Sequence, residues 1–168
     1  MSRRKTIQVM LDPKSVDAAI KEIEAYEKWI ARKTNELNER LATFGATIAR
    51  RLFDLAIYDG DVDVHVTAKP IDGGWAIVAL GQTLLYLEYG AGRFFNPTDA
   101  SYPGTRPPGV GGIGSQGHGW GNRRGWGFRL NGESVFTRGN PPAAAMYHAE
   151  QEILDNLNEI AKDVFSRG

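Results

Sequence analysis

The residues best suited to chemistry lie in a glycine-rich stretch in the second half of the chain. Trp120 and Trp126 flank Arg123 and Arg124 there, with glycines interleaved among them. Single-stranded nucleic-acid binders use this composition, since bases stack on aromatic rings and guanidinium groups meet phosphates. The same residue types are enriched at the hot spots of protein–protein interfaces. The formal net charge of the chain is zero, so overall electrostatics give nucleic acid no advantage. We therefore favour a protein contact and keep nucleic-acid binding as the alternative.

The sequence gives little indication of catalysis or of a bound metal or cofactor. His65, His118 and His148 share no metal-ligand spacing, and the chain has no cysteine. A Gly-x-Ser-x-Gly nucleophile motif is missing. The glycines of residues 109–114 fit the spacing of a dinucleotide-binding pattern, but the match is only partial because no predicted helix follows them. We predict a protein that is not an enzyme, with no catalytic, cofactor-binding or metal-binding residues.

Glu88 is the one charged residue in an otherwise apolar turn, residues 84–89. Two interpretations stay open from the sequence. The carboxylate lies at the domain surface near a helix end, or it forms an ion pair between subunits with an arginine of the glycine-rich stretch.

Residues 91–139 form a predicted extended loop insertion within a single domain of residues 1–168. Glycine and proline crowd this segment and no hydrophobic period survives in it. Most connections in compact domains run about 4–6 residues, so a loop of this length is either functional or disordered. Its large aromatic side chains argue against an unbound linker, because disordered segments are poor in them. We interpret the rest of the chain as a scaffold that displays the insertion.

A long N-terminal helix is the first element of that scaffold. Asp12 and Pro13 form a cap and a first helical residue. Beyond them, apolar residues recur at helical spacing. The pattern thins over residues 31–36, which leaves open one bent helix or a helix pair. The predicted core stripe comprises Val16, Ile20, Ile23, Ile30, Leu37, Leu41, Phe44, Ile48, Leu52 and Leu55.

Strand and turn signals follow the long helix. Residues 62–68 alternate strictly between apolar and polar, and residues 70–74 have hairpin-turn composition. Residues 75–80 are more uniformly apolar and are predicted to form a central strand. Residues 82–89 predict a short helix that ends at Gly90 in a left-handed conformation.

A second hairpin is predicted over residues 128–136, around an Asn-Gly pair. The last helix is predicted to be capped by Asn140-Pro141-Pro142 and to run to about Ser166. The predicted fold class is α+β, with the N-terminal helix or helix pair and the C-terminal helix packed on a small, mainly antiparallel sheet.

Two short motifs, taken with the order of elements, resemble a known family. The first is Leu85-Tyr86-Leu87-Glu88-Tyr89-Gly90, and the second is the start of the last helix, residues 140–149. Together they are similar to the tail-completion proteins of long-tailed siphophages and prophages. Ala91 stands where that family often has Thr, and the loop is longer than in the family.

The resemblance implies a non-enzymatic structural virion protein of the neck or tail. Such a protein forms a homo-oligomeric ring, by resemblance a hexamer, between the head-connector and tail-tube proteins, and DNA in the neck lumen is a further candidate partner. It is assembled in the bacterial host cytoplasm. No segment approaches the length of apolar residues needed to span a bilayer. The residues expected at subunit or partner contacts are Glu88, Tyr89, Arg93, Trp120, Arg123, Arg124 and Trp126.

Overall fold

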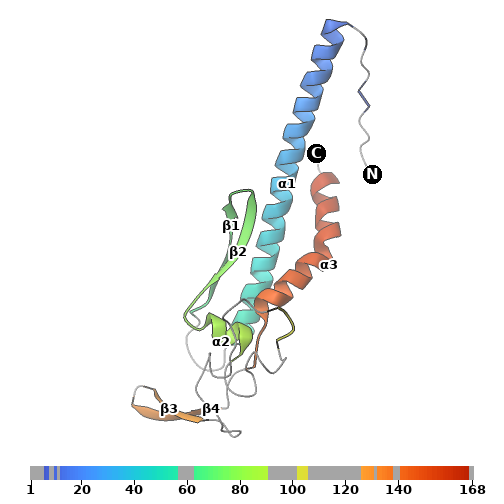
Figure 1. Ribbon diagram of the computed structural model, residues 1–168. Helices are drawn as coiled ribbons and strands as arrows, with labels where there is room; N and C mark the ends of the chain where they lie inside the picture. Colours follow the sequence, from blue (N-terminus) through green and yellow to red (C-terminus); the bar gives the residue numbers. More distant parts are fainter. Residues whose placement is uncertain are drawn as a thin grey trace.

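The chain folds as an α+β structure, as predicted, with long helices at both ends and short antiparallel hairpins between them (Figure 1). The computed structural model describes residues 6–7, 10, 12–56, 63–90, 102–105, 126–130, 132–137 and 141–166. The elements in chain order are α1 (Pro13–Leu55), β1 (His65–Ile71), β2 (Gly74–Leu80), α2 (Leu84–Tyr89), β3 (Trp126–Leu130), β4 (Glu133–Thr137) and α3 (Ala145–Ser166).

One continuous helix, α1, occupies the region for which the sequence left a helix pair open. Asp12 caps it as predicted, because its side chain accepts a hydrogen bond from the backbone N–H of Ser15 at 3.0 Å. Across the polar stretch that interrupts the apolar pattern, Glu36 pairs with Lys33 and with Arg40, each at 3.0 Å. Pairs at this spacing lie on one helix face and support the helix through its polar segment.

The buried face of α1 differs from the predicted stripe. Its buried positions in the second half are small residues followed by one aromatic: Ala42, Gly45, Ala46, Ala49 and Phe53. A Cβ atom on Gly45 would lie 2.4 Å from Ile153 of α3 and 2.5 Å from Ile77 of β2. The small face therefore lets a strand and a helix approach α1 closely. Of the predicted stripe, Leu37, Leu41, Phe44, Ile48 and Leu52 are half-buried, whereas Val16, Ile20, Ile23, Ile30 and Leu55 are exposed.

The hairpin of β1 and β2 packs along α1 (Figure 1). Val64 and Val66 point into the core, and the turn lies at Asp72 and Gly73, within the predicted turn segment. The prediction that residues 75–80 form a central strand is wrong, because β2 belongs to a two-stranded sheet in the described chain. Its apolar residues up to Ala79 are only half-buried and Leu80 is exposed, and Trp75 and Ile77 border an open groove.

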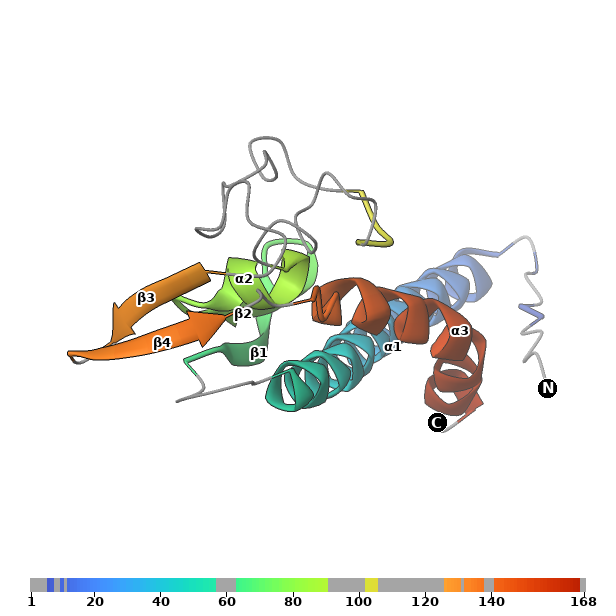
Figure 2. The same ribbon diagram turned by 90° about the horizontal axis from the view of Figure 1, so that it is seen from below.

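The predicted second hairpin is confirmed around Gly132, whose φ of +89° suits the turn. In both views β3 and β4 extend away from the helices (Figures 1 and 2). Gly90 follows α2 with the expected positive φ of +78°, but its ψ of 164° lies outside the left-handed helical region.

The C-terminal helix α3 runs beside the second half of α1 and bends partway along (Figure 1). Near its end, Asp163 accepts a hydrogen bond from Arg40 at 2.7 Å, and Phe165 packs edge-on against Trp29. The N-terminal part of α1, before Trp29, continues beyond this contact. The predicted cap is wrong, because α3 begins at Ala145, after both prolines. Its first N–H groups are bound by a side chain from a distant segment.

Candidate functional site

The buried carboxylate of Glu88 lies at the start of α3, where it acts as a cap supplied from elsewhere in the chain. Its Oε2 accepts the backbone N–H of Met146 at 3.0 Å, and its Oε1 accepts that of Tyr147 at 3.4 Å. The hydroxyl of Tyr102 donates to Oε1 at 2.9 Å. The first N–H groups of a helix lack partners within the helix, so a carboxylate there satisfies them and suits the helix dipole.

The surface location considered for Glu88 is therefore wrong, since the residue is only 4% exposed. The ion pair with an arginine of the insertion stays a prediction, because the described residues include only the backbone of Arg129 in β3 and none of the other arginines of the insertion. The contacts that the structure shows for this carboxylate are made within the chain.

Two backbone hydrogen bonds join the same segments. The N–H of Ala143 donates to the carbonyl of Leu87 at 2.7 Å, and the N–H of Ala144 donates to the carbonyl of Glu88 at 3.2 Å. Ala144 has a φ of +49°, a conformation that non-glycine residues seldom adopt. Its own carbonyl then accepts from the N–H of His148 at 2.9 Å and so opens the helical ladder. The strained turn aligns both the backbone bridge and the first turn of α3.

Three tyrosines pack around the carboxylate. The rings of Tyr89 and Tyr102 lie 4.8 Å apart, and those of Tyr102 and Tyr147 lie 6.1 Å apart. Burial raises the pKa of Tyr102, and the charge of Glu88 and its hydrogen bond raise it further. Tyr102 therefore stays a neutral donor to the carboxylate. We refer to the carboxylate of Glu88, the hydroxyl of Tyr102 and the backbone of residues 143–147 as the Glu88 clamp.

The clamp joins the two ends of the insertion. Residue 90 leaves α2 one position after Tyr89, and the chain returns at residue 141 directly before the bridging backbone of residues 143–144. Tyr102, which lies inside the insertion, is tied to the same point. The insertion therefore begins and ends at one place on the body.

A second polar cap, formed by Asp63, fixes the start of α2. The Asp63 carboxylate accepts from the backbone N–H groups of Gln82 and Thr83 and from the Thr83 hydroxyl. These bonds, with that of the Thr83 hydroxyl foremost, lower the pKa of Asp63. A Cβ on Gly81 would lie 2.6 Å from the carbonyl oxygen of Asp63. Only glycine lets the two segments approach this closely.

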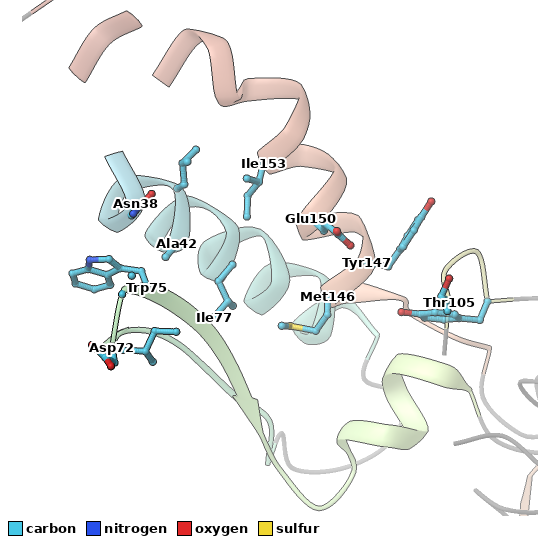
Figure 3. A pocket seen from close by; sticks show the side chains of 15 residues that line it. Asn38, Ala42, Asp72, Trp75, Ile77, Thr105, Met146, Tyr147, Glu150 and Ile153 are labelled. Carbon is cyan, nitrogen blue, oxygen red and sulfur yellow. The ribbon is translucent and has the colours of Figure 1, made fainter. Parts of the chain in front are cut away.

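An open groove lies between β2, α1 and the first turns of α3 (Figure 3). Ala42, Ile77 and Ile153 line its apolar part, and Glu150 lies at its side with Asp72 at the hairpin turn. Neither a histidine nor a serine is among the described residues that line it. The groove can accept apolar side chains, but no observed contact indicates which.

Of the predicted contact residues, the structure brings together only Glu88 and Tyr89, both of them buried. Arg93, Trp120, Arg123 and Arg124 lie outside the described residues, and Trp126 opens β3. Sequence reasoning missed Tyr102 and Tyr147 as partners of Glu88. Tyr147 lies within the second motif, residues 140–149, whereas Tyr102 lies inside the insertion and outside both motifs.

The histidines that the structure describes do not form a site. His65 on β1 and His148 on α3 are both exposed, and His118 lies outside the described residues. Within the described ranges, no group of three or more His, Cys, Asp or Glu residues could hold a metal ion. None of the described helices is both long and apolar enough to cross a membrane.

Comparison with known proteins gave no match to this chain: no family model, no curated protein and no solved structure matches it.

Proposed function

We propose that the chain is a structural virion protein of a long-tailed phage or prophage, a neck or tail-completion subunit. It joins the head connector to the tail tube as an oligomeric ring, hexameric by resemblance, and it has no enzymatic activity. One observation carries the proposal. The two segments that resemble tail-completion proteins, residues 85–90 and 140–149, meet in the Glu88 clamp although the insertion separates them. Two short motifs that contact each other support one shared architecture more strongly than two independent matches.

The arrangement of the body and the insertion also supports this proposal. A ring subunit needs a rigid body and an element that reaches its neighbour, and a head-to-tail contact closes into a ring when the rotation allows. The helices and the β1–β2 hairpin supply the body, and the β3–β4 hairpin extends away from it (Figure 2). The clamp fixes the base of the insertion, so its aromatic and arginine residues can be held toward a partner.

The structure divides the predicted contact residues into two roles. Glu88 and Tyr89 hold the base of the insertion from within the chain. The remaining residues are proposed to contact the neighbouring subunit or the head and tail partners: Arg93, Trp120, Arg123, Arg124 and Trp126. Trp and Arg suit this role, since they dominate the binding energy of many interfaces.

Native mass spectrometry of the purified chain tests the proposal. The matched variant replaces residues 106–125 by a Gly-Ser segment of equal length, which removes Trp120, Arg123 and Arg124 but keeps Tyr102 in the clamp. A ring from the intact chain that is lost in the folded variant supports the proposal. If the intact chain forms no ring, the sample is repeated with head-connector and tail-tube proteins. No ring and no binding to either partner would contradict the proposal.

The alternative function, nucleic-acid binding by the insertion, is distinguished from the neck proposal by how binding depends on salt concentration. Binding through phosphate contacts weakens steeply as the salt concentration rises. Under the neck proposal, ring formation depends on the tryptophans as well as the arginines. Under the alternative, Arg123→Ala with Arg124→Ala abolishes DNA binding and leaves the oligomeric state unchanged.

A further inference from the structure

The open groove between β2, α1 and α3 is bordered by a strand edge that no described strand pairs with. Within the described chain, β2 pairs with β1 along one edge only. Trp75 and Ile77 of β2 lie across the groove from Ile153 of α3 (Figure 3). The second edge of β2 therefore faces the groove, and the backbone N–H and C=O groups of such an edge can pair with a further strand.

The groove combines an apolar floor with negative charge at its sides. Ala42, Ile77 and Ile153 form the floor. Asp72 lies at the hairpin turn, and Glu150 lies toward the start of α3 (Figure 3). No lysine, arginine or histidine is among the described residues that line the groove. The occupant that fits is an extended segment with aliphatic side chains on one face and positive charge at one end.

The segment that precedes α1 has this composition. Ile7, Val9 and Leu11 recur at every second position, which places them on one face of a strand. Residues 3–5, directly before them, are all basic. We refer to residues 3–11 as the N-terminal arm. Its apolar face matches the floor of the groove, and its positive charge matches the two carboxylates.

The apolar part of the N-terminal arm cannot reach the groove of its own chain. Ile77 lies at Gly45 of α1, where an added Cβ would be 2.5 Å from it. From Pro13 to Gly45 the continuous helix rises about 48 Å, at about 1.5 Å per residue. From Pro13 back to Val9 an extended chain spans at most about 14 Å, at about 3.6 Å per residue. An arm that fills this groove must therefore come from another copy.

We propose that the N-terminal arm of a second copy binds in the groove and pairs with the open edge of β2 as a third strand. Ile7, Val9 and Leu11 pack on the apolar floor, with Val9 beside Ile77 near the centre. The basic residues 3–5 lie near one of the two carboxylates. Main-chain hydrogen bonds supply affinity in such strand addition, and alternate side chains supply specificity.

This contact goes beyond the proposed function, because it needs only a second copy of the chain. The arm and the groove are different surfaces, so the contact is heterologous and can repeat from copy to copy. It uses no residue of the segment 106–125. Replacing that segment tests the proposed function, whereas altering the arm tests the present contact, so the two can fail separately.

Cysteine cross-linking between full-length chains tests the contact, because the native sequence has no cysteine. Under mild oxidation, a mixture of Val9→Cys and Ile77→Cys chains is expected to form covalent dimers. Neighbouring residues on one face of paired strands have Cβ atoms about 4.5–5.5 Å apart, within reach of a disulfide. Gln8→Cys is the matched control, since Gln8 lies on the other face of the strand, and it is expected to link to Ile77→Cys several-fold less.

Two results of the cross-linking would overturn the proposal. One is equal linking of Gln8→Cys and Val9→Cys to Ile77→Cys, which would exclude an ordered strand. The other is preferential linking of Ile77→Cys to Trp120→Cys, which would assign the groove to the insertion. Linking of Val9→Cys to Ile77→Cys that persists after replacement of residues 106–125 would support the arm contact independently of the insertion.

Light scattering over a range of protein concentrations tests the association without altering the groove. The native chain is expected to exceed its monomer mass of 18.5 kDa as the concentration rises. Val9→Glu is expected to weaken this association, because it places a carboxylate on the apolar floor beside Asp72 and Glu150. Gln8→Glu adds the same charge to the other face of the arm and is expected to keep it. Equal association of the two variants, or none in the native chain, would overturn the proposal.

Discussion

Substitutions of Glu88 that alter the shape of the side chain only slightly test how much the Glu88 clamp contributes to the free energy of unfolding. Glu88→Gln keeps one carbonyl oxygen for Tyr102 and Tyr147 but sets an NH₂ group against the N–H of Met146, which now carries a bond of 3.0 Å. A buried donor left unsatisfied costs about 1–3 kcal/mol, so Glu88→Gln should lower the free energy of unfolding by about that amount. Glu88→Ala removes every acceptor. We expect a loss of about 3–4 kcal/mol, because water can replace part of the cap at the helix end.

Urea unfolding followed by circular dichroism measures these losses as shifts of the midpoint at constant slope. Glu159→Gln is the matched control, since Glu159 is exposed on the same helix α3, and such surface changes stay within about 0.5 kcal/mol. A double-mutant cycle of Glu88→Ala with Tyr102→Phe isolates the pair, because each substitution alone removes the hydrogen bond between them. We expect a coupling of about 1.5–3 kcal/mol, as for a hydrogen bond to a charged group.

Amide hydrogen exchange shows which part of the structure is destabilised when Glu88 is replaced. The amides of Met146 and Tyr147 should exchange faster in Glu88→Gln, while those in the middle of α1 should follow only the global loss of stability. A loss below about 0.5 kcal/mol in Glu88→Ala, the size of an ordinary surface change, would refute the clamp as a stabilising contact.

Three further predictions concern the second cap and the buried tyrosine. Gly81→Ala should lower the free energy of unfolding by about 2–3 kcal/mol, because its Cβ would overlap the backbone of Asp63, while Gly74→Ala, with open space around it, should change little. The pKa of Tyr102 is raised in the folded state, so its contribution to stability is complete below the unfolded pKa of about 10 and is lost as pH rises above it. Unfolding measured against pH should show this alkaline loss in the native chain and less of it in Tyr102→Phe. The pKa of Asp63 is lowered by Thr83, so its contribution is present above about pH 4 and is lost as pH falls through the folded pKa. Asp63→Asn should reduce that acid dependence, and an unchanged acid profile would contradict the cap.

The sequence predicted best those elements whose signals are local. Asp12 and Pro13 fix the start of α1 within one turn, and the glycine after Asn131 fixes the β3–β4 hairpin. Both signals act between neighbours in the chain, through capping and through a positive φ. Local signals could equally place the turn at Asp72 and Gly73.

Elements set by tertiary contacts were predicted less well. The start of α3 was misplaced because its cap comes from Glu88, 58 positions before Met146, and no pattern near residue 145 reveals it. The buried face of α1 was misassigned because the search favoured large aliphatic residues. Where elements cross as closely as they do at Gly45, the core needs small residues.

The Glu88 clamp also explains how a long insertion can coexist with a stable body. Ordering a segment costs conformational entropy for each residue, and closing a longer loop adds only slowly to that cost. The clamp brings the ends of the insertion together with bonds to the backbone of residues 143–147 and to one tyrosine hydroxyl. The described contacts that hold the body together do not depend on the composition of residues 106–125. The contact surface of the insertion can therefore change while the body keeps its fold, provided that Glu88, Tyr102 and the backbone turn at Ala144 are retained.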